Sequence, residues 1–580
     1  MAWGTSVALM VGIGIGIYRG ASKPEMKENS PPGRSDAALI DTGRRTMRAV
    51  TFTEDVAPVL FQQCTPCHRP GQRFPFGLAT YQDVVGKADR ILAAVTSRRM
   101  PPWQADPMCG PFANARLLTT NEIAVFTDWA ALGKPEGDPR RLPALPDFTS
   151  GWRLGAPDLI ASAPAAFRLQ PSTNDTYYNM VVPLALDRPR YVRAVEFSPG
   201  IAGLVHHAFL RFDRSGRCRK LSAENQGVGF AGLHLPGGAF SSDSQFLSWQ
   251  PGRAPSEVPV GLAWRLQPGT DLILQLHLSP VSQAYGVQPS VAFYFTDEPP
   301  KRHGYKVRLT SFTFTIPAGA RDFVVREEFT TPIASQLVAL LPHAHRLARR
   351  VTVTTTAPGE SARRVLEIPR WDFDWQTDYN LRPELTLPAG TKLAVEFSYD
   401  NPSSRPVSYG SNTSDEMAEL WVLLAVDSAA GVMALGKAES PLVIRDTIAY
   451  NEYLLRSDPG DWRARLQVAN ALLTRRDASG ALVQLERAVA TAPNEAEPHY
   501  WSGYALRELK RMDEAAREFG EAVRCDPSNG AAHGSLGWIL LAQRRLEAAA
   551  AEFRRALEID PHDALARRGL AASSSGTPAR

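Results

Sequence analysis

Apolar and polar positions alternate with different periods along the chain. Between residues 152 and 435, short runs alternate at a period of two, at 192–197, 271–277, 291–295, 351–355 and 393–399. This alternation predicts half-buried β-strands, and the Pro and Gly residues between the runs favour antiparallel sandwiches over strand–helix–strand units. Residues 49–137 and those after about 440 have helical spacing instead. We therefore predict a multidomain chain, with a small all-α domain, two all-β sandwich domains (152–300 and 301–435) and an α-helical C-terminal region.

The helical region after residue 440 repeats itself. Its signature prolines lie 34 residues apart, at Pro459, Pro493, Pro527 and Pro561. A small residue recurs within each period, at Ala481, Ala515 and Ala549, and so does a bulky one, at Leu485, Phe519 and Phe553. This 34-residue helix–turn–helix period resembles the tetratricopeptide repeat. By resemblance, residues 440–570 form a solenoid that binds a protein partner; a purely structural cap is the alternative. We expect a disordered tail at 571–580.

The N-terminus carries a candidate export segment. Residues 2–18 are apolar and uncharged, a suitable length for a secretory signal and a marginal one for a membrane span. We assign 1–22 to a signal peptide or membrane anchor, with a buried helix as the alternative, and expect a periplasmic or otherwise extracytoplasmic protein. Residues 23–48 and 138–151 are rich in Pro, Gly and polar residues, which predicts linkers.

Composition narrows the function classes. The 64 Lys and Arg residues against 60 Asp and Glu give a net charge of +4 with no dense basic run, so we expect no nucleic-acid partner. The mean hydropathy is −0.22, and one continuous apolar stretch excludes a multi-span membrane protein. The chain has five cysteines, two of them in one short motif, which excludes a disulfide-rich secreted scaffold.

The sequence Cys64-Thr65-Pro66-Cys67-His68 has the spacing of a c-type haem attachment site. In such a motif two thiols bond the porphyrin edge and the adjacent imidazole ligates the iron. A zinc site would need two more ligands at similar spacing, and the chain has no second CxxC. We predict one covalent haem c within 49–137, and zinc or thiol chemistry is the alternative.

The residues around this motif resemble a small cytochrome c domain, with an apolar helix start at 56–61 and a methionine flanked by prolines. Methionine is the usual sixth ligand of iron in that family, so the resemblance implies this role for Met100, within a loop stiffened by Pro101 and Pro102. Met108 is the competing ligand, and loop packing is the alternative role of Met100. Cys109 is left unpaired in this interpretation.

Five of the 11 histidines fall in three places in the β-rich region, His206, His207, His277, His343 and His345. A His-x-His pair on a strand points both imidazoles to one face, so His343 and His345 are placed to bind one ion. Adjacent strand residues point to opposite faces, so His206 and His207 would need a strand end, a bulge or an edge position to share one. The repeat histidines His499, His533 and His562 are expected to be surface or packing residues without a shared repeat position.

The order HH, H, HxH, followed by Met417 in Ser414-Asp415-Glu416-Met417, resembles the copper type II ascorbate-dependent monooxygenases, the family of peptidylglycine alpha-hydroxylating and dopamine beta-monooxygenases. The resemblance implies two jelly-roll-like sandwiches, each holding one copper, across a solvent-filled cleft. It implies an electron-transfer copper bound by His206, His207 and His277. It also implies a copper at which O2 and substrate react, bound by the catalytic residues His343, His345 and Met417.

Donor chemistry agrees with copper, because two imidazoles and a thioether favour soft Cu(I) over Zn(II). The chain departs from the animal enzymes in having only Cys218 in this region and Ala418 directly after the methionine. Trp371, Trp375 and Tyr379 are expected to be sandwich core rather than a substrate site.

Together these features predict an exported haem–copper oxidoreductase. We expect a monooxygenase that hydroxylates a C–H bond of an unknown organic substrate with O2, with electrons passing from an ascorbate-like reductant or redox protein through the haem. The alternative is a non-catalytic electron-transfer or copper-binding scaffold that recruits a protein partner through its repeats.

Overall fold

The computed structural model describes residues 49–69, 76–146, 152–201, 203–225, 228–232, 235, 245–249 and 255–575. The predicted signal or anchor at 1–22 and the predicted linker at 23–48 lie outside the described residues. Within those ranges, none of the helices has both the length and the apolar character that crossing a bilayer requires.

A helical segment follows residue 50 and has an apolar core of its own, in which Phe52 lies against Trp129. The side chains of Thr80 and Thr119 cap its second and fourth α-helices by accepting hydrogen bonds from backbone N–H groups of the first turn. Its elements are η1 (Phe52–Val56), α1 (Ala57–Gln63), α2 (Tyr81–Val85), α3 (Ala88–Thr96), α4 (Thr120–Ala131) and, inside the predicted linker 138–151, η2 (Pro139–Arg141).

Residues 103–114, between α3 and α4, do not join that helical core. Ala105 and Phe112 are buried in the core of the second sandwich, and Phe112 forms an isolated β-bridge with Leu381. The prediction of a single helical domain over 49–137 is wrong for this stretch, because its apolar residues pack with strands that lie far away in the sequence.

The first sandwich consists of two five-stranded antiparallel sheets and one two-stranded sheet. One sheet has the order β1-β12-β4-β8 with β9 on β4, the second has the order β6-β3-β10-β5-β7, and β2 pairs with β11. Strand β10 is buried at every position, because it is a central strand that pairs with β3 and β5. The helix α5 (Arg217–Glu224) follows β5. The strands are β1 (Leu159–Ser162), β2 (Phe167–Leu169), β3 (Thr176–Pro183), β4 (Arg190–Ser198), β5 (Val205–Asp213), β6 (Gly229–Ala231), β7 (Gln245–Trp249), β8 (Ser256–Glu257), β9 (Trp264–Leu266), β10 (Asp271–Leu278), β11 (Tyr285–Val287) and β12 (Ser290–Thr296).

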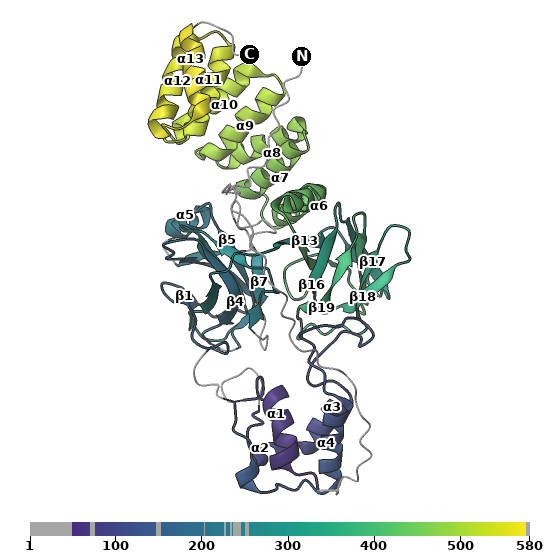
Figure 1. Ribbon diagram of the computed structural model, residues 1–580. Helices are drawn as coiled ribbons and strands as arrows, with labels where there is room; N and C mark the ends of the chain where they lie inside the picture. The colour runs from purple at the N-terminus through teal and green to yellow at the C-terminus, as the bar shows by residue number, and fades with distance from the viewer. Residues whose placement is uncertain are drawn as a thin grey trace, which may run out of the picture. The chain divides into compact units, whose positions relative to one another are not determined.

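The second sandwich packs two four-stranded antiparallel sheets, β13-β22-β16-β19 and β15-β20-β17-β18, around one apolar core, and β14 pairs with β21 (Figure 1). Alternating burial along β16 and β17 is the period of two expected from the sequence. The strands are β13 (His303–Ser311), β14 (Thr315–Ile316), β15 (Phe323–Thr330), β16 (Ser335–Ala344), β17 (Ala348–Thr356), β18 (Arg363–Ile368), β19 (Tyr379–Leu387), β20 (Lys392–Tyr399), β21 (Val407–Ser408) and β22 (Ala418–Val426).

A 29-residue helix, α6, leads from the second sandwich into the helical repeats. Its buried Glu439 accepts hydrogen bonds from the Tyr305 hydroxyl at 2.6 Å and the Arg308 N–H at 2.9 Å, both on β13. The last helix ends at Ser575, so the prediction of a disordered tail is wrong for residues 571–575. The helices are α6 (Ala429–Ser457), α7 (Trp462–Thr474), α8 (Ala478–Thr491), α9 (Ala496–Glu508), α10 (Met512–Cys525), α11 (Gly530–Ala542), α12 (Leu546–Ile559) and α13 (Ala564–Ser575).

Two repeat histidines occupy equivalent places, so the prediction that they share no repeat position is wrong. The Nδ1 of His499 lies 2.8 Å from Glu518, and the Nδ1 of His533 lies 2.6 Å from Glu552. Each Nε2 contacts the carbonyl oxygen of a signature proline, at 3.1 and 3.2 Å. The hydrogen bond to Glu518 raises the pKa of His499. These histidines hold each turn between repeats to the helix that follows.

Candidate metal centre

His206, His207 and His277 come together where β5 and β10 pair. The register joins His277 to His207 and then Leu278 to Val205, so His206 is the extra residue of a β-bulge. A bulge releases a strand from strict alternation, and two consecutive side chains then reach the same side. The sequence left a strand end, a bulge or an edge position open for His206 and His207, and the structure has the bulge.

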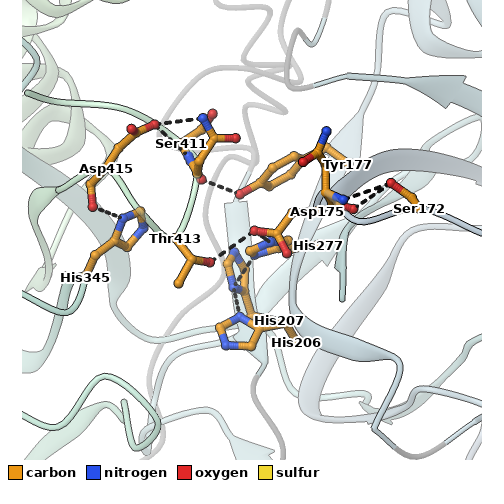
Figure 2. A network of polar contacts seen from close by, with 12 residues as sticks. Ser172, Asp175, Tyr177, His206, His207, His277, His345, Ser411, Thr413 and Asp415 are labelled. Carbon is orange, nitrogen blue, oxygen red and sulfur yellow. Dashed lines mark hydrogen bonds and ion pairs between the residues drawn. The ribbon is translucent and has the colours of Figure 1, made fainter. Parts of the chain in front are cut away.

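The ring nitrogens of this first histidine group converge (Figure 2). Nδ1 of His207 lies 3.1 Å from Nδ1 of His206 and 3.2 Å from Nδ1 of His277. The candidate ligand atoms of all three residues lie within 4.8 Å of one another. Imidazole nitrogens bind a metal at about 2.0–2.1 Å, which in tetrahedral geometry separates neighbouring ligand atoms by about 3.3 Å. These separations fit three imidazoles that share one metal ion.

Two residues just before and within β3 orient His277. Asp175 Oδ2 lies 3.2 Å from its Nε2, and the Tyr177 ring stacks on the imidazole at a centroid distance of 4.4 Å. A carboxylate beside one ring nitrogen favours the tautomer with hydrogen at that nitrogen, which leaves Nδ1 as the ligand atom. The sequence contains no local pattern that marks Asp175 or Tyr177, since their place beside His277 depends on β3 pairing with β10.

His343 and His345 lie at the end of β16 and directly after it, with ring centroids 5.4 Å apart. Nδ1 of His343 lies 2.7 Å from Gln376 Oε1, and Nδ1 of His345 lies 3.0 Å from the Asp415 carbonyl oxygen. Both partners are acceptors, so both Nδ1 atoms carry the hydrogen and both Nε2 atoms keep a lone pair. This second histidine group thus offers the opposite ring nitrogens from the first.

Met417 lies beside His345, directly before the neighbouring strand β22. The register pairs His343 with Glu419 and Ala344 with Ala418, so Met417 comes next in line. Its half-buried side chain packs against an aromatic cluster that includes Tyr409. The structure thus brings the backbones of the three predicted ligands together, and their joint binding of copper stays a prediction.

Buried Glu416 organises the backbone of this pair of strands. Its carboxylate accepts hydrogen bonds from the N–H groups of His345, Leu347 and Met417, the last two at 2.8 and 2.9 Å. Burial raises the pKa of this carboxyl group to about 7, and the backbone hydrogen bonds oppose that rise. Glu416 therefore holds His345 and Met417 in place from within the core.

The two histidine groups are in contact, whereas the resemblance implied a solvent-filled cleft between them. The rings of His207 and His343 have centroids 5.9 Å apart. The Tyr177 hydroxyl donates to the Ser411 carbonyl oxygen at 2.6 Å, and the Thr413 hydroxyl donates to Asp175 at 3.1 Å (Figure 2). These bonds hold the loop before Met417 against the first sandwich, which brings the groups together.

Burial keeps four of the five imidazoles of this centre uncharged. Burial and, to a smaller extent, neighbouring imidazoles lower the pKa of His207 well below its usual value and that of His345 to about 3. Burial also lowers the pKa of His343 and of His277. Neutral imidazole is the form that ligates metals. These four side chains can therefore ligate a cation at neutral pH without first losing protons.

Sequence reasoning missed Phe373 and Gln376, which lie in the turn between β18 and β19. Phe373 stacks on His206 at 5.2 Å and meets His345 edge-on at 5.7 Å. Trp371 in the same turn and Tyr379 at the start of β19 are buried in the sandwich core, as predicted, whereas Trp375 is only half-buried. Neither Phe373 nor Gln376 is a usual metal ligand, so no sequence motif identified this turn as part of the site.

The CxxCH motif forms a turn at the end of α1. The N–H groups of Cys67 and His68 donate to the Cys64 carbonyl oxygen at 3.1 and 2.9 Å, and burial raises the pKa of the Cys64 thiol to about 12. Met100 follows α3 and is half-buried, whereas the competing Met108 is 93% exposed. Two thiols and an imidazole on one turn have the donor chemistry that covalent haem needs.

Two families match parts of the chain. Residues 324–435 match the copper type II ascorbate-dependent monooxygenase, C-terminal domain, a range that includes His343, His345 and Met417. Residues 466–530 and 502–564 match the tetratricopeptide repeat. The chain therefore carries a C-terminal domain of this copper family followed by tetratricopeptide repeats, as predicted. No curated protein matches the chain.

Several solved structures resemble a minor part of the chain. The MamA protein is 17% identical, with a TM-score of 0.23 over 24% of this chain and 76% of that chain. YrrB, described as a TPR protein with an unusual peptide-binding site, is 19% identical, with a TM-score of 0.22 over 24% of this chain and 74% of that chain. The first TPR of Spaghetti (RPAP3), bound to an HSP90 peptide, is 20% identical, with a TM-score of 0.20 over 20% of this chain and 91% of that chain.

Proposed function

We propose that this chain is an exported haem–copper oxidoreductase, a copper-dependent monooxygenase that hydroxylates a C–H bond of an organic substrate. The balanced reaction is R–H + O2 + two electrons + two protons giving R–OH + H2O. The observation that supports it most is the contact between the two histidine groups, where the ring centroids of His207 and His343 are 5.9 Å apart. The second of these groups lies in a domain of the copper monooxygenase family.

The proposal assigns one copper to each group. His206, His207 and His277 would hold the first through Nδ1, and His343 and His345 would hold the second through Nε2, together with Met417. Copper supplies one-electron chemistry and the activation of O2 there, and a thioether among imidazoles suits its reduced form. Burial keeps four of these imidazoles neutral, all but that of His206. Neighbouring acceptors fix the tautomers of His277, His343 and His345.

The proposal assigns haem c to the CxxCH turn, with Cys64 and Cys67 as the covalent attachments and His68 and Met100 as the axial ligands. Exposure of Met108 supports Met100 in that role. An ascorbate-like reductant or a redox protein would reduce the haem, which would pass single electrons to the first copper. Residues 1–22 would direct export to the periplasm, as a signal or an anchor, and the repeats would bind a protein partner.

The test uses the full chain matured with haem and loaded with copper. Metal analysis and electron paramagnetic resonance should find two cupric ions per haem. Reduced haem should be reoxidised by O2 faster in this sample than in a matched copper-free sample. Equal rates in the two samples would refute electron supply from haem to copper, and fewer than two cupric ions would refute the two-copper centre.

A non-catalytic scaffold is the second candidate, favoured by one observation: the Met417 side chain packs against an aromatic cluster. Met417→Ala separates the two functions. If the chain is an enzyme, the variant should lose oxygen consumption while haem redox cycling and partner binding persist. If the chain is a scaffold, the copper-loaded wild type should show no more oxygen consumption than this variant.

A further inference from the structure

The segment of residues 103–114, which leaves the helical domain after α3, holds the outer side of the turn between β18 and β19. This turn is the one that contacts the histidines. The side-chain amide of Gln104 donates to the carbonyl oxygens of Asp372, at 3.1 Å, and of Trp375, and accepts from the Asp372 N–H at 2.9 Å. One side chain therefore fixes both ends of a four-residue stretch whose second residue is Phe373.

The same segment holds the end of this turn nearest β19. Asn114 donates to the Asp378 carbonyl oxygen at 2.7 Å and accepts from the Asn380 N–H at 3.1 Å. The Trp103 ring meets Tyr379 edge-on at 5.1 Å. The hydrogen bonds to residues 372–380 thus come from partners 264 to 271 positions earlier in the chain.

The inner side of this turn contacts both histidine groups. Gln376 Oε1 accepts from Nδ1 of His343 at 2.7 Å, and its amide nitrogen donates to the Phe373 carbonyl oxygen at 3.0 Å. That second bond fixes which end of the Gln376 amide faces the imidazole. A shift of the turn by a few tenths of an ångström would change the hydrogen bond that sets the His343 tautomer.

We propose that Gln104 is a positioning residue of the histidine centre, acting through residues 372–376 to hold Gln376 against His343. The segment that follows Met100 is then a structural part of the second histidine group and does not merely connect two domains. The tautomer part of this inference stands on the hydrogen bonds alone, and its consequence for metal affinity rests on the proposed copper binding.

The experiment compares Gln104→Leu, Gln376→Leu and the double variant in the full chain. Cu(I) affinity is measured by competition with a chromophoric chelator. Gln376→Leu should weaken one of the two Cu(I) sites about 10–100-fold, as losses of outer hydrogen bonds do. Gln104→Leu should weaken the same site by a smaller factor. The double variant should be no weaker than Gln376→Leu, because the effects of residues that act in series are not additive.

A readout without metal separates this inference from the proposed function. Nitrogen-15 spectra of the histidine side chains should show one tautomer of His343, with hydrogen at Nδ1, in the wild type and a mixture in Gln104→Leu. The matched control is Gln336→Leu, which removes an exposed amide that bonds to Thr386 on the same sandwich. It should leave both readouts unchanged.

The outcomes are distinct. An unchanged His343 tautomer in Gln104→Leu would overturn the inference, and so would additive losses in the double variant. Equal losses at both Cu(I) sites, accompanied by a lower melting temperature, would show that Gln104 serves only general stability. Absence of Cu(I) binding in the wild type, with the tautomer still dependent on Gln104, would refute the proposed function and leave the positioning role intact.

Discussion

Replacing Glu416 with glutamine should loosen the backbone around His345 locally. The carboxylate accepts hydrogen bonds from three N–H groups. Those of His345 and Met417 donate to Oε1, and that of Leu347 donates to Oε2. An amide must place its NH2 group at one of these oxygen positions, so at least one buried N–H loses its acceptor. Losing a hydrogen bond to a charged acceptor costs about 1.5–3 kcal/mol, and the remaining bonds weaken as their acceptor becomes neutral. Relief from burying a charge offsets part of this loss.

We expect the substitution to lower the free energy of opening this strand pair by about 2–3 kcal/mol, which corresponds to about 30–150-fold faster amide exchange, since about 1.4 kcal/mol is a factor of ten. Hydrogen exchange with mass spectrometry on a peptide covering 343–348 measures this directly, because local opening exposes those amides. The assay is run at pH 8, above the pKa of about 7 that burial gives this carboxyl group. Exchange in the repeats should not change.

Glu396→Gln is the matched control for this prediction. Glu396 lies on β20 of the same sandwich, where its half-exposed carboxylate pairs with Arg326 at 3.0 Å. An exposed ion pair contributes about 0–1 kcal/mol, so this variant should leave exchange at 343–348 close to that of the wild type. Unchanged exchange in Glu416→Gln, or equal acceleration in both variants, would refute the assigned role of Glu416.

Further predictions concern single residues. Because the folded-state pKa of His499 is raised above its unfolded value, its bond to Glu518 should stabilise the repeats fully below about pH 6.5 and lose that effect as pH rises through the folded-state pKa. Calorimetry should show the midpoint of the repeats falling across this window, less so in Glu518→Gln. Gly503→Ala should destabilise the repeats by about 1–3 kcal/mol because its Cβ would lie 2.8 Å from a phenyl ring in the next helix. Gly520→Ala meets nothing within 4 Å and should stabilise them by about 0.5–1 kcal/mol in the same denaturation assay. Asp175→Asn should weaken Cu(I) binding at the first histidine group about 10–100-fold by chelator competition, and an unaltered affinity would contradict its orienting role.

Local patterns predicted what depends on neighbouring residues. The His-x-His spacing placed His343 and His345 on one face of a strand, and the 34-residue period identified the repeats before any packing was known. The position of His206 was harder to predict, because its bulge exists only where β5 pairs with β10. The sequence alone does not determine the register of that pairing. The approach of the two histidine groups likewise depends on hydrogen bonds between the two sandwiches.

Residues that support the site were the least predictable. Gln104 and Gln376 carry ordinary amides, and their roles come from contacts with backbone atoms and an imidazole far away in the sequence. The helical pattern assigned residues 103–114 to the first domain because spacing along a chain says nothing about which core receives an apolar side chain. Phe112 and Trp103 instead pack around Tyr379, a partner that only the folded sheet supplies.

The helix α6 belongs to two domains at once. Glu439 in its first half is buried against β13, and Tyr450 in its second half joins the aromatic cluster beside Met417 before α7 begins. Melting of the second sandwich would thus remove the support on which the first repeat nucleates. On heating, this sandwich and the adjoining end of the solenoid should therefore unfold in a single calorimetric transition. A separately expressed solenoid that begins at residue 440 would start in the middle of α6, with its first turns unprotected.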